Sequence, residues 1–432
     1  MNESIKPGAL WHNRSFMLLW SGQSASQFGS AITTIVLPLF AVLALGASTF
    51  EIGLLTSAST IGFLLFGLPA GAIVERLTKR RTMLWCDVLR SVALSSIPLA
   101  VLLGGLTLAH LFVVALVMGF LTVFFEVAYQ SYLPSLVSRD QLIDGNGKLG
   151  TTESLATTVG PGIAGVLISI VGGAWSIVLD GVTYMLSSIS LMLIRTPEYR
   201  ADTGSAFRIR GMRKEIVEGL SYTLSHPILR RLSACVVSVN LFGAVYNSIE
   251  IPYLFRVLHA PAFMIGVVVG IGGMGGILGG MVAAPFSRRF GSARIVTYPL
   301  VVIGSIGLLT PFAQPGWGVL LVSVGLAGNM AASVVFIIGA ASYRQAVCPS
   351  SMLSRVAASL RWVAWGTLPL GGLLGGTLGT ALGIRSTVAV AVVGCWASGF
   401  LVLLSPLRKV RDFVTPDETE IEESIAGISR AG

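Results

Sequence analysis

Long apolar runs alternate with short polar loops along this chain. Each run is long enough for the ~20 residues that a helix needs to cross the hydrocarbon core of a bilayer. The runs are continuous, without the period-two alternation of membrane barrels, which favours helices over strands. The pattern predicts an all-α integral membrane protein with twelve transmembrane helices, at 16–45, 50–74, 83–104, 108–135, 147–171, 174–194, 232–257, 262–286, 293–313, 317–345, 353–382 and 386–405.

The basic residues predict the orientation of these helices. If the N-terminus lies inside, all but four of the 29 Lys and Arg residues fall in inner segments. Arg256 and Arg385 fall in outer loops, and Arg90 and Arg361 fall within spans. Because Lys and Arg concentrate in cytoplasmic loops, we expect a multi-pass protein of a bacterial cytoplasmic (inner) membrane, with both termini in the cytoplasm. The net charge of +9 therefore reflects topology and does not indicate nucleic-acid binding.

The chain also repeats itself. The stretch F-G-S-A-I-T-T-I-V-L-P at 28–38 parallels F-G-A-V-Y-N-S-I-E-I-P at 242–252, and Pro161 matches Pro369 at nearly the same offset. Such parallel repeats of six spans are typical of one large class of secondary transporter, in which substrate binds between the halves. The predicted organisation is an N-terminal six-helix half (1–195), a cytoplasmic linker with an amphipathic helix (196–231), a C-terminal six-helix half (232–405) and a disordered cytoplasmic tail (406–432).

A glycine and charged residues follow the second predicted span, in G-A-I-V-E-R-L-T-K-R-R. This stretch resembles the loop signature of the major facilitator superfamily (MFS), with Glu in place of the usual Asp. The resemblance implies the MFS fold, and a loop that helps to hold the outward-facing state through a close helix contact and an acid–base latch. The alternative is that its basic residues only anchor the topology. The residues concerned are Gly71, Glu75, Arg76, Lys79 and Arg80.

The fifth predicted span contains A-T-T-V-G-P-G-I-A-G, which resembles the signature of the antiporter branch of this superfamily. Gly160, Pro161 and Gly165 match that signature, and alanines replace two of its glycines. The resemblance implies export by antiport. Because small residues and proline are common in membrane helices, ordinary helix packing is the alternative explanation.

Three further stretches, F-F-E-V-A-Y-Q-S-Y-L-P, D-V-L-R and H-P-I-L-R-R, are similar to a bacterial exporter group that includes macrolide efflux proteins and the enterobactin exporter. This resemblance implies a secondary active transporter that works by alternating access: a proton-coupled efflux system for a drug-like, natural-product or siderophore small molecule. The alternatives are an uptake symporter for a nutrient or siderophore, and a non-transporting receptor or scaffold.

We expect no enzymatic activity, because the sequence carries no phosphate loop, nucleotide-binding motif or metal-ligand spacing, and its four cysteines are scattered. The expected partners are a small-molecule substrate, protons and the lipid bilayer, with no nucleic acid. We expect a monomer driven by the proton gradient, without cofactor or metal.

Two glutamates stand within apolar spans without an obvious partner on their own helix. Asp, Lys and Arg cost at least roughly 2.5–3.5 kcal/mol at the centre of a membrane helix, and such residues are functional candidates. A carboxyl removed from water holds its proton more firmly, so we hypothesise that Glu126, Glu250 or both carry the coupling proton. The repeat mate of Glu250 is Val36, so the fold does not require an acid there. The alternative is a protonated glutamate that is hydrogen-bonded to a neighbouring helix.

Other charges suggest pairs. Glu153 and Arg361 are repeat mates, and an ion pair between them would form a gate in the inner half of the membrane; a static pair or two separate charges are the alternatives. Asp87 and Arg90 are three residues apart on one helix face, so we expect them to neutralise each other.

Aromatic and amide side chains on the helices expected to face the cavity suit a bulky amphipathic ligand. The alternative is that they face lipid or pack internally. The candidates are Phe125, Tyr129, Asn240, Tyr246, Trp362 and Trp365.

Overall fold

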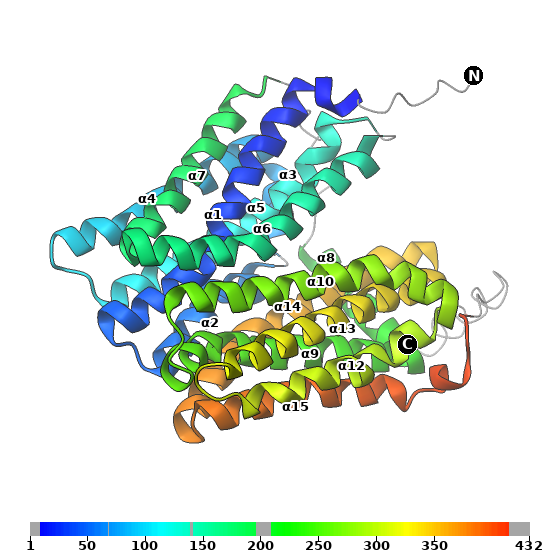
Figure 1. Ribbon diagram of the computed structural model, residues 1–432. Coiled ribbons are helices and arrows are strands. Elements are labelled where there is room, and N and C mark those ends of the chain that lie inside the picture. Colours follow the sequence, from blue (N-terminus) through cyan, green and yellow to red (C-terminus); the bar gives the residue numbers. More distant parts are fainter. Residues whose placement is uncertain (1–8, 68, 139–140, 196–208, 414–432) are drawn as a thin grey trace.

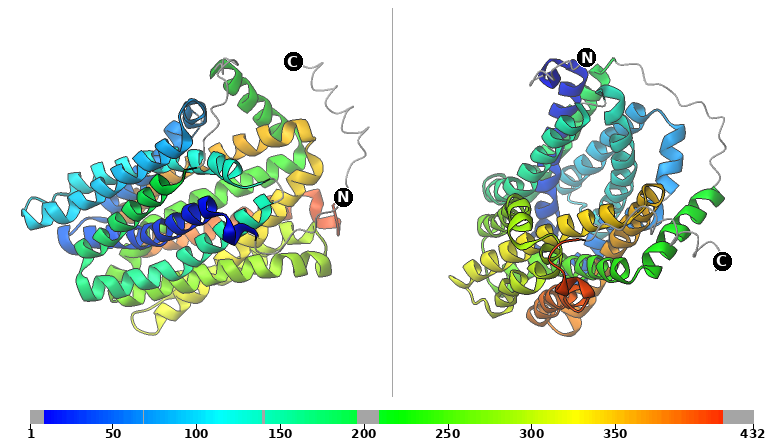
Figure 2. Two further views of the ribbon diagram at one scale, coloured as in Figure 1. Left: turned by 90° about the horizontal axis from the view of Figure 1, so that it is seen from above. Right: turned by 90° about the vertical axis from the view of Figure 1, so that its right-hand side faces the viewer.

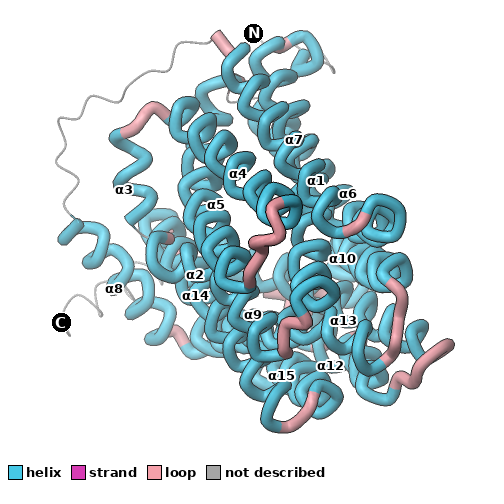
Figure 3. Tube along the Cα trace, turned by 90° about the vertical axis from the view of Figure 1, so that its left-hand side faces the viewer, coloured by secondary structure: helices cyan, strands magenta, loops and turns pink. Residues whose placement is uncertain are grey.

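The computed structural model describes residues 9–67, 69–138, 141–195 and 209–413. Within them every regular element is a helix (Figure 3). The α-helices are α1 (Arg14–Leu45), α2 (Thr49–Phe66), α3 (Pro69–Arg76), α4 (Lys79–Leu102), α5 (Leu108–Leu136), α6 (Leu142–Val171), α7 (Gly173–Leu193), α8 (Ile209–Ser225), α9 (Pro227–Pro252), α10 (Ala262–Phe290), α11 (Arg294–Thr297), α12 (Pro299–Val302), α13 (Gly318–Val347), α14 (Ser350–Ala381) and α15 (Ile384–Leu403). The 3₁₀-helices are η1 (Ala9–His12), η4 (Gly304–Phe312) and η5 (Pro406–Lys409), and η3 (Tyr253–Val257) is a π-helix.

The predicted all-α membrane architecture is confirmed. Among the described residues, ten helices are long and apolar enough to cross a membrane. The eleventh predicted span, 353–382, corresponds to α14, a helix of 32 residues. The remaining predicted span, 293–313, lies over three short consecutive helices, as described next.

Two predicted spans are interrupted. The expectation of one continuous helix over 293–313 is wrong, because α11, α12 and η4 divide that stretch. Pro299 begins α12 and lacks the backbone N–H that would continue α11 into it, which accounts for the break at Tyr298. The predicted span 50–74 is also divided, since α2 ends at Phe66 and α3 begins at Pro69.

The helices form two bundles, one from α1–α7 and the other from α9–α15 (Figure 1). The bundles contact each other mainly through two helix pairs, α2 with α14 and α6 with α10. In Figure 1 they meet on the left and diverge towards the right, where α1 begins and α15 ends. We call that side the open end of the molecule and the opposite side the sealed end.

The apolar cores follow this division. One cluster of buried residues draws on both bundles, with Leu39 and Ile52 from the first and Ile249 and Ile265 from the second. It occupies the sealed end, and we call it the shared cluster. Two other clusters lie towards the open end, and each draws on one bundle only. The buried cluster that draws on both bundles thus lies at the sealed end, whereas the bundles have separate cores towards the open end.

Glycines allow the bundles to approach closely at the sealed end. A Cβ atom added to Gly53 on α2 would lie only 2.6 Å from the carbonyl oxygen of Gly372 and the Cα of Gly376 on α14. Gly266 on α10 packs in the same way against the carbonyl oxygen of Pro161 on α6. Such small-residue contacts let membrane helices pack backbone to backbone.

The amphipathic helix expected in the linker is present as α8. It packs against α14 and α9 of the second bundle (Figure 2), and its Glu218 forms a 2.6 Å ion pair with Arg355. The rest of the predicted linker, 196–208, and most of the predicted disordered tail, 414–432, lie outside the described residues.

Candidate functional site

A small polar pocket opens within the first bundle, between its middle and the open end. Its volume is about 40 Å³, which is room for about three water molecules. We call it the acidic pocket, because its wall carries two carboxylates. Its lining residues are Gln23, Ser24 and Gln27 from α1, Glu126 and Tyr129 from α5, and Leu149, Thr152 and Glu153 from α6.

Glu126 lies on the part of α5 that runs towards the open end. It is four residues past the middle of α5, or about 6 Å towards the open end at ~1.5 Å per residue. Its side chain is partly buried on the wall of the pocket. A carboxyl group in this position can exchange a proton with water that enters from the open end.

Glu250 has a different environment. Its side chain is 6% exposed, and the Oε1 atom has no hydrogen-bond partner among the described residues. Its neighbours Ile249 and Ile251 belong to the shared cluster. The continuous span from Pro227 to Val257 places Glu250 about 12 Å from the span centre, towards the sealed end. In this conformation the cluster at the sealed end encloses Glu250, apart from the pocket that Glu126 lines.

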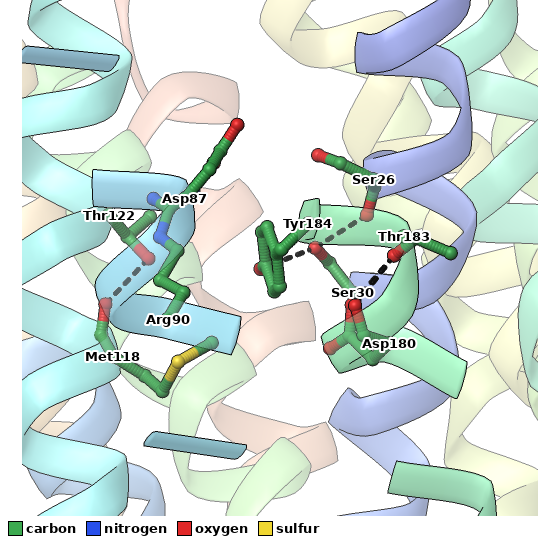
Figure 4. A network of polar contacts seen from close by, with 9 residues as sticks. All are labelled: Ser26, Ser30, Asp87, Arg90, Met118, Thr122, Asp180, Thr183 and Tyr184. Carbon is green, nitrogen blue, oxygen red and sulfur yellow. Dashed lines mark hydrogen bonds and ion pairs between the residues drawn. The ribbon is translucent and has the colours of Figure 1, made fainter. Parts of the chain in front are cut away.

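The expected pairing of Asp87 with Arg90 is confirmed. The Arg90 Nη1 atom lies 3.3 Å from Asp87 Oδ1, and both side chains are buried. The guanidinium also lies over the rings of Phe125, at 4.6 Å, and Tyr184, at 5.1 Å. Figure 4 shows Tyr184 between Arg90 and Ser30, whose Oγ lies 2.8 Å from the tyrosine hydroxyl. The sequence predicts only the pair, whereas the fold connects it to α1 and α7.

The predicted gate between Glu153 and Arg361 is not closed in this structure. The Arg361 Nη1 atom donates instead to Oε1 of Gln130, at 3.2 Å, and the guanidinium lies 5.8 Å from the ring centroid of Trp365. Glu153 is exposed on the pocket wall. An ion pair at the open end would require the two bundles to approach, so the gate stays a prediction for the other conformation.

With this geometry in hand, the chain can be compared with known proteins. A family model described as "Transmembrane secretion effector" matches residues 6–425. The chain belongs to this family. It is a multi-pass membrane transporter of the major facilitator superfamily.

Two relatives of this transporter are efflux proteins. It is 24% identical over 394 residues to the multidrug efflux pump Tap of Mycolicibacterium fortuitum, which covers 90% of this chain and 94% of that protein. It is 26% identical over 186 residues to macrolide efflux protein A of Streptococcus pyogenes, which covers 42% of this chain and 45% of that one.

A solved structure confirms the fold. A bacterial homologue of the human lysosomal transporter Spinster, in an inward-facing and unoccupied conformation, superposes with a TM-score of 0.72. The sequence identity is 15%, and the superposition covers 93% of this chain and 97% of that one.

The antiporter signature of this transporter lies at close helix contacts. A Cβ atom on Gly160 would lie 2.5 Å from the Cβ of Ala31 on α1, and one on Gly165 would lie 2.8 Å from the carbonyl oxygen of Ala262 at the start of α10. The signature therefore holds α6 against α1 and against the second bundle, with Pro161 at the same crossing.

The residues of the loop signature make few contacts with other helices in this conformation. A Cβ atom on Gly71 would meet nothing within 4 Å among the described residues, so no close helix contact is seen there within that part of the chain. Glu75 and Arg76 are exposed. Arg80 donates from Nη2 to the carbonyl oxygen of Met192, at 3.2 Å, and Lys79 begins α4. A role for this loop in the outward-facing state stays a prediction.

The candidate substrate residues of the transporter do not share one surface. Phe125 is only 1% exposed and packs inside the first bundle, so the expectation that it faces the cavity is wrong for this state. Tyr129 lines the acidic pocket. Trp362 and Trp365 lie at the seam with α2, where Trp362 Nε1 donates to the carbonyl oxygen of Leu64, at 3.3 Å.

The two remaining candidates lie on α9. Asn240 donates from Nδ2 to the carbonyl oxygen of Val236 on its own helix, at 2.9 Å. The hydroxyl of Tyr246 is buried without a hydrogen-bond partner among the described residues, one turn before Glu250.

Sequence reasoning missed Arg256, which joins the two bundles at the sealed end. Its guanidinium donates to the carbonyl oxygen of Ala47 and, at 3.4 Å, to Oγ1 of Thr49. A signal was available, since Arg256 is one of only two basic residues expected in outer loops. Sequence reasoning also missed Gln23, because an amide within an apolar helix is a weaker indication of function than a charged residue.

Proposed function

We propose that this transporter is a proton-coupled exporter of the bacterial cytoplasmic membrane, with both termini in the cytoplasm. Its cargo would be a drug-like, natural-product or siderophore small molecule. The observation that carries the direction of transport is the match to a multidrug efflux pump over nine-tenths of both chains. The antiporter signature, with Gly160 and Gly165 at helix contacts, supports the same direction.

Alternating access follows from the two ends of the molecule. If the termini are cytoplasmic, the open end faces the cytoplasm and the sealed end faces outwards. Substrate would then enter this conformation from the cytoplasm. Closure of the open end and opening of the sealed end would release it outside, which is the cycle that an exporter requires.

Glu126 is better placed than Glu250 to carry the coupling proton. It lines a polar pocket towards the open end, whereas Glu250 is enclosed at the sealed end. In the conformation seen here, only Glu126 of these two can pass a proton to water at the open end. Proton release into the cytoplasm is the step that an exporter driven by an inward proton gradient must complete.

The test uses vesicles that contain the purified transporter and a pH-sensitive dye. A panel of antibiotics, including a macrolide, and of siderophores is scanned for compounds whose transport moves protons in the opposite direction. Glu126→Gln keeps the side-chain shape and removes the titrating group, so substrate-driven proton movement should fall to background. Asp144→Asn is the control, because Asp144 forms an exposed ion pair with Lys148 outside the pocket.

Two results would contradict the proposal. Unchanged proton movement in Glu126→Gln would remove this residue from the coupling step. Movement of protons and substrate in the same direction by the unmodified protein would show an uptake symporter.

A further inference from the structure

We propose that the acidic pocket binds the positively charged group of the substrate, so that the cargo belongs to the class of organic amines and other small organic cations. This inference rests on the proposed export function and deepens it. It concerns the part of the substrate that the pocket recognises, which the family match leaves open.

The charge of the pocket wall favours a cation. Of its eight lining residues, Glu126 and Glu153 are acidic and none is basic. Arg90 and Arg361 both act electrostatically on Glu126. The first is held by Asp87 and two aromatic rings. The second is held by Gln130, so neither cation fills the pocket.

Gln23 provides an independent indication of a ligand. Its side chain is 4% exposed and lies on the pocket wall, and Oε1 has no hydrogen-bond partner among the described residues. A buried carbonyl oxygen without a partner carries a desolvation cost of about 1–3 kcal/mol. An ammonium or guanidinium group in the pocket would donate to this oxygen and would be attracted by the two carboxylates.

The two hydroxyls that Thr152 and Ser24 place on the wall are engaged already. The Thr152 hydroxyl accepts from Nε1 of Trp20, at 3.1 Å, and donates to the carbonyl oxygen of Lys148, at 3.0 Å. The Ser24 hydroxyl donates to the carbonyl oxygen of Trp20, at 2.6 Å. Gln23, Gln27, Tyr129 and the two glutamates therefore provide the acceptors that the pocket offers to a ligand.

The size of the pocket limits what enters it. A volume of about 40 Å³ admits a group of a few heavy atoms and excludes a whole drug-sized molecule. The charged group of the substrate would occupy the pocket, and the apolar body would lie outside it, between the bundles. Tyr129 on the pocket wall supplies an aromatic face beside a bound cation.

The experiment compares a cationic fluorescent probe with a neutral derivative of the same body. Dansylcadaverine carries a primary ammonium group, and its N-acetyl derivative is a neutral amide with the same body. Binding of each to the purified, detergent-solubilised transporter is measured by fluorescence titration at one fixed pH. We expect the amine to bind about tenfold more tightly than the amide, as hydrogen bonds to charged groups would provide.

Two variants test whether the preference for the amine arises in the acidic pocket. Glu153→Gln removes a charge from an exposed position, and Gln23→Met keeps the length of the side chain but removes its oxygen. Each should weaken binding of the amine severalfold and leave binding of the amide unchanged. Asp144→Asn on the same helix, outside the pocket, should change neither. Circular dichroism and size-exclusion profiles check that the variants fold.

Equal affinity for the two probes, or no binding of either by the unmodified protein, would overturn the inference. Equal weakening of both probes in the variants would also overturn it. Failure of the proposed function is recognised separately in the vesicle assay. Amine-selective binding without proton movement would uphold the cation site and refute proton-coupled export. Proton movement driven equally by neutral and cationic compounds would uphold proton-coupled export and refute the cation site.

Discussion

The two ends of this transporter are held in different ways. At the sealed end one apolar cluster draws on both bundles, and glycines bring α2 against α14 and α6 against α10. At the open end each bundle has a core of its own. The surfaces that would meet there carry Glu153 and Arg361, both exposed.

The difference shows which forces close each end. Closure of the sealed end buries apolar surface and needs close backbone contact, with Arg256 as the charged residue that bonds across it. Closure of the open end would instead bring charges together, and their desolvation must be offset by pairing. In a transporter built in this way, a small difference in free energy between the two kinds of contact decides which end is closed. Three substitutions at the sealed end test that view.

The largest effect is expected from Gly53→Ala. The added Cβ would lie 2.6 Å from backbone atoms of α14, and overpacking of this kind costs about 1–3 kcal/mol. A cysteine at Ile52, a buried member of the shared cluster, reports exposure of the sealed end to a membrane-impermeant maleimide. Its labelling rate should rise by about tenfold.

Gly243→Ala is the matched control, because a Cβ at Gly243 would meet nothing within 4 Å. The four native cysteines are all buried, so their background labelling should be low. Equal labelling of the two alanine variants would show that glycine contacts do not hold the sealed end.

A smaller effect is expected from Arg256→Ala. The variant loses the hydrogen bonds to Ala47 and Thr49 across the bundles. Because such bonds contribute about 0.5–1.5 kcal/mol each, labelling of the cysteine at position 52 should rise by about fivefold. Arg385→Ala, which removes the other outer arginine, should leave labelling unchanged. If both variants increase labelling equally, positive charge in the outer loops keeps the sealed end closed, and the specific hydrogen bonds of Arg256 do not.

The smallest effect is expected from Glu250→Gln. The substitution preserves shape in an apolar setting and removes a group that would be unfavourable there if ionised. Labelling at position 52 should therefore stay within about twofold of the parent, and proton movement in vesicles should persist. Loss of proton movement would show that Glu250, and not Glu126 alone, takes part in coupling.

Several elements were predictable because local rules decide them. The apolar runs and the distribution of Lys and Arg predict the helices, since a bilayer imposes both length and loop charge. The pair formed by Asp87 and Arg90 was predictable too, because residues three apart share a helix face. The break of the predicted span 293–313 was missed, although its prolines could have indicated it.

The candidate site was less predictable. Glu126 and Glu250 look alike in sequence, each a lone acid in an apolar helix. Their difference depends on which neighbours the other helices supply, and no pattern on one helix contains that information. Gln23 and Glu153 reach the pocket from α1 and α6, far from Glu126 in the chain.

The sequence by itself thus determined that this protein crosses a membrane repeatedly, that it is built of two related halves and that it resembles the MFS transporters. The first property follows from the bilayer, which acts on each helix separately, and the other two follow from repeats and motifs within the sequence. Only the tertiary structure decided that one end is sealed and the other open, that Glu126 meets a polar pocket while Glu250 is enclosed, and that Arg256 joins the halves. These properties depend on contacts between helices that are distant in the chain.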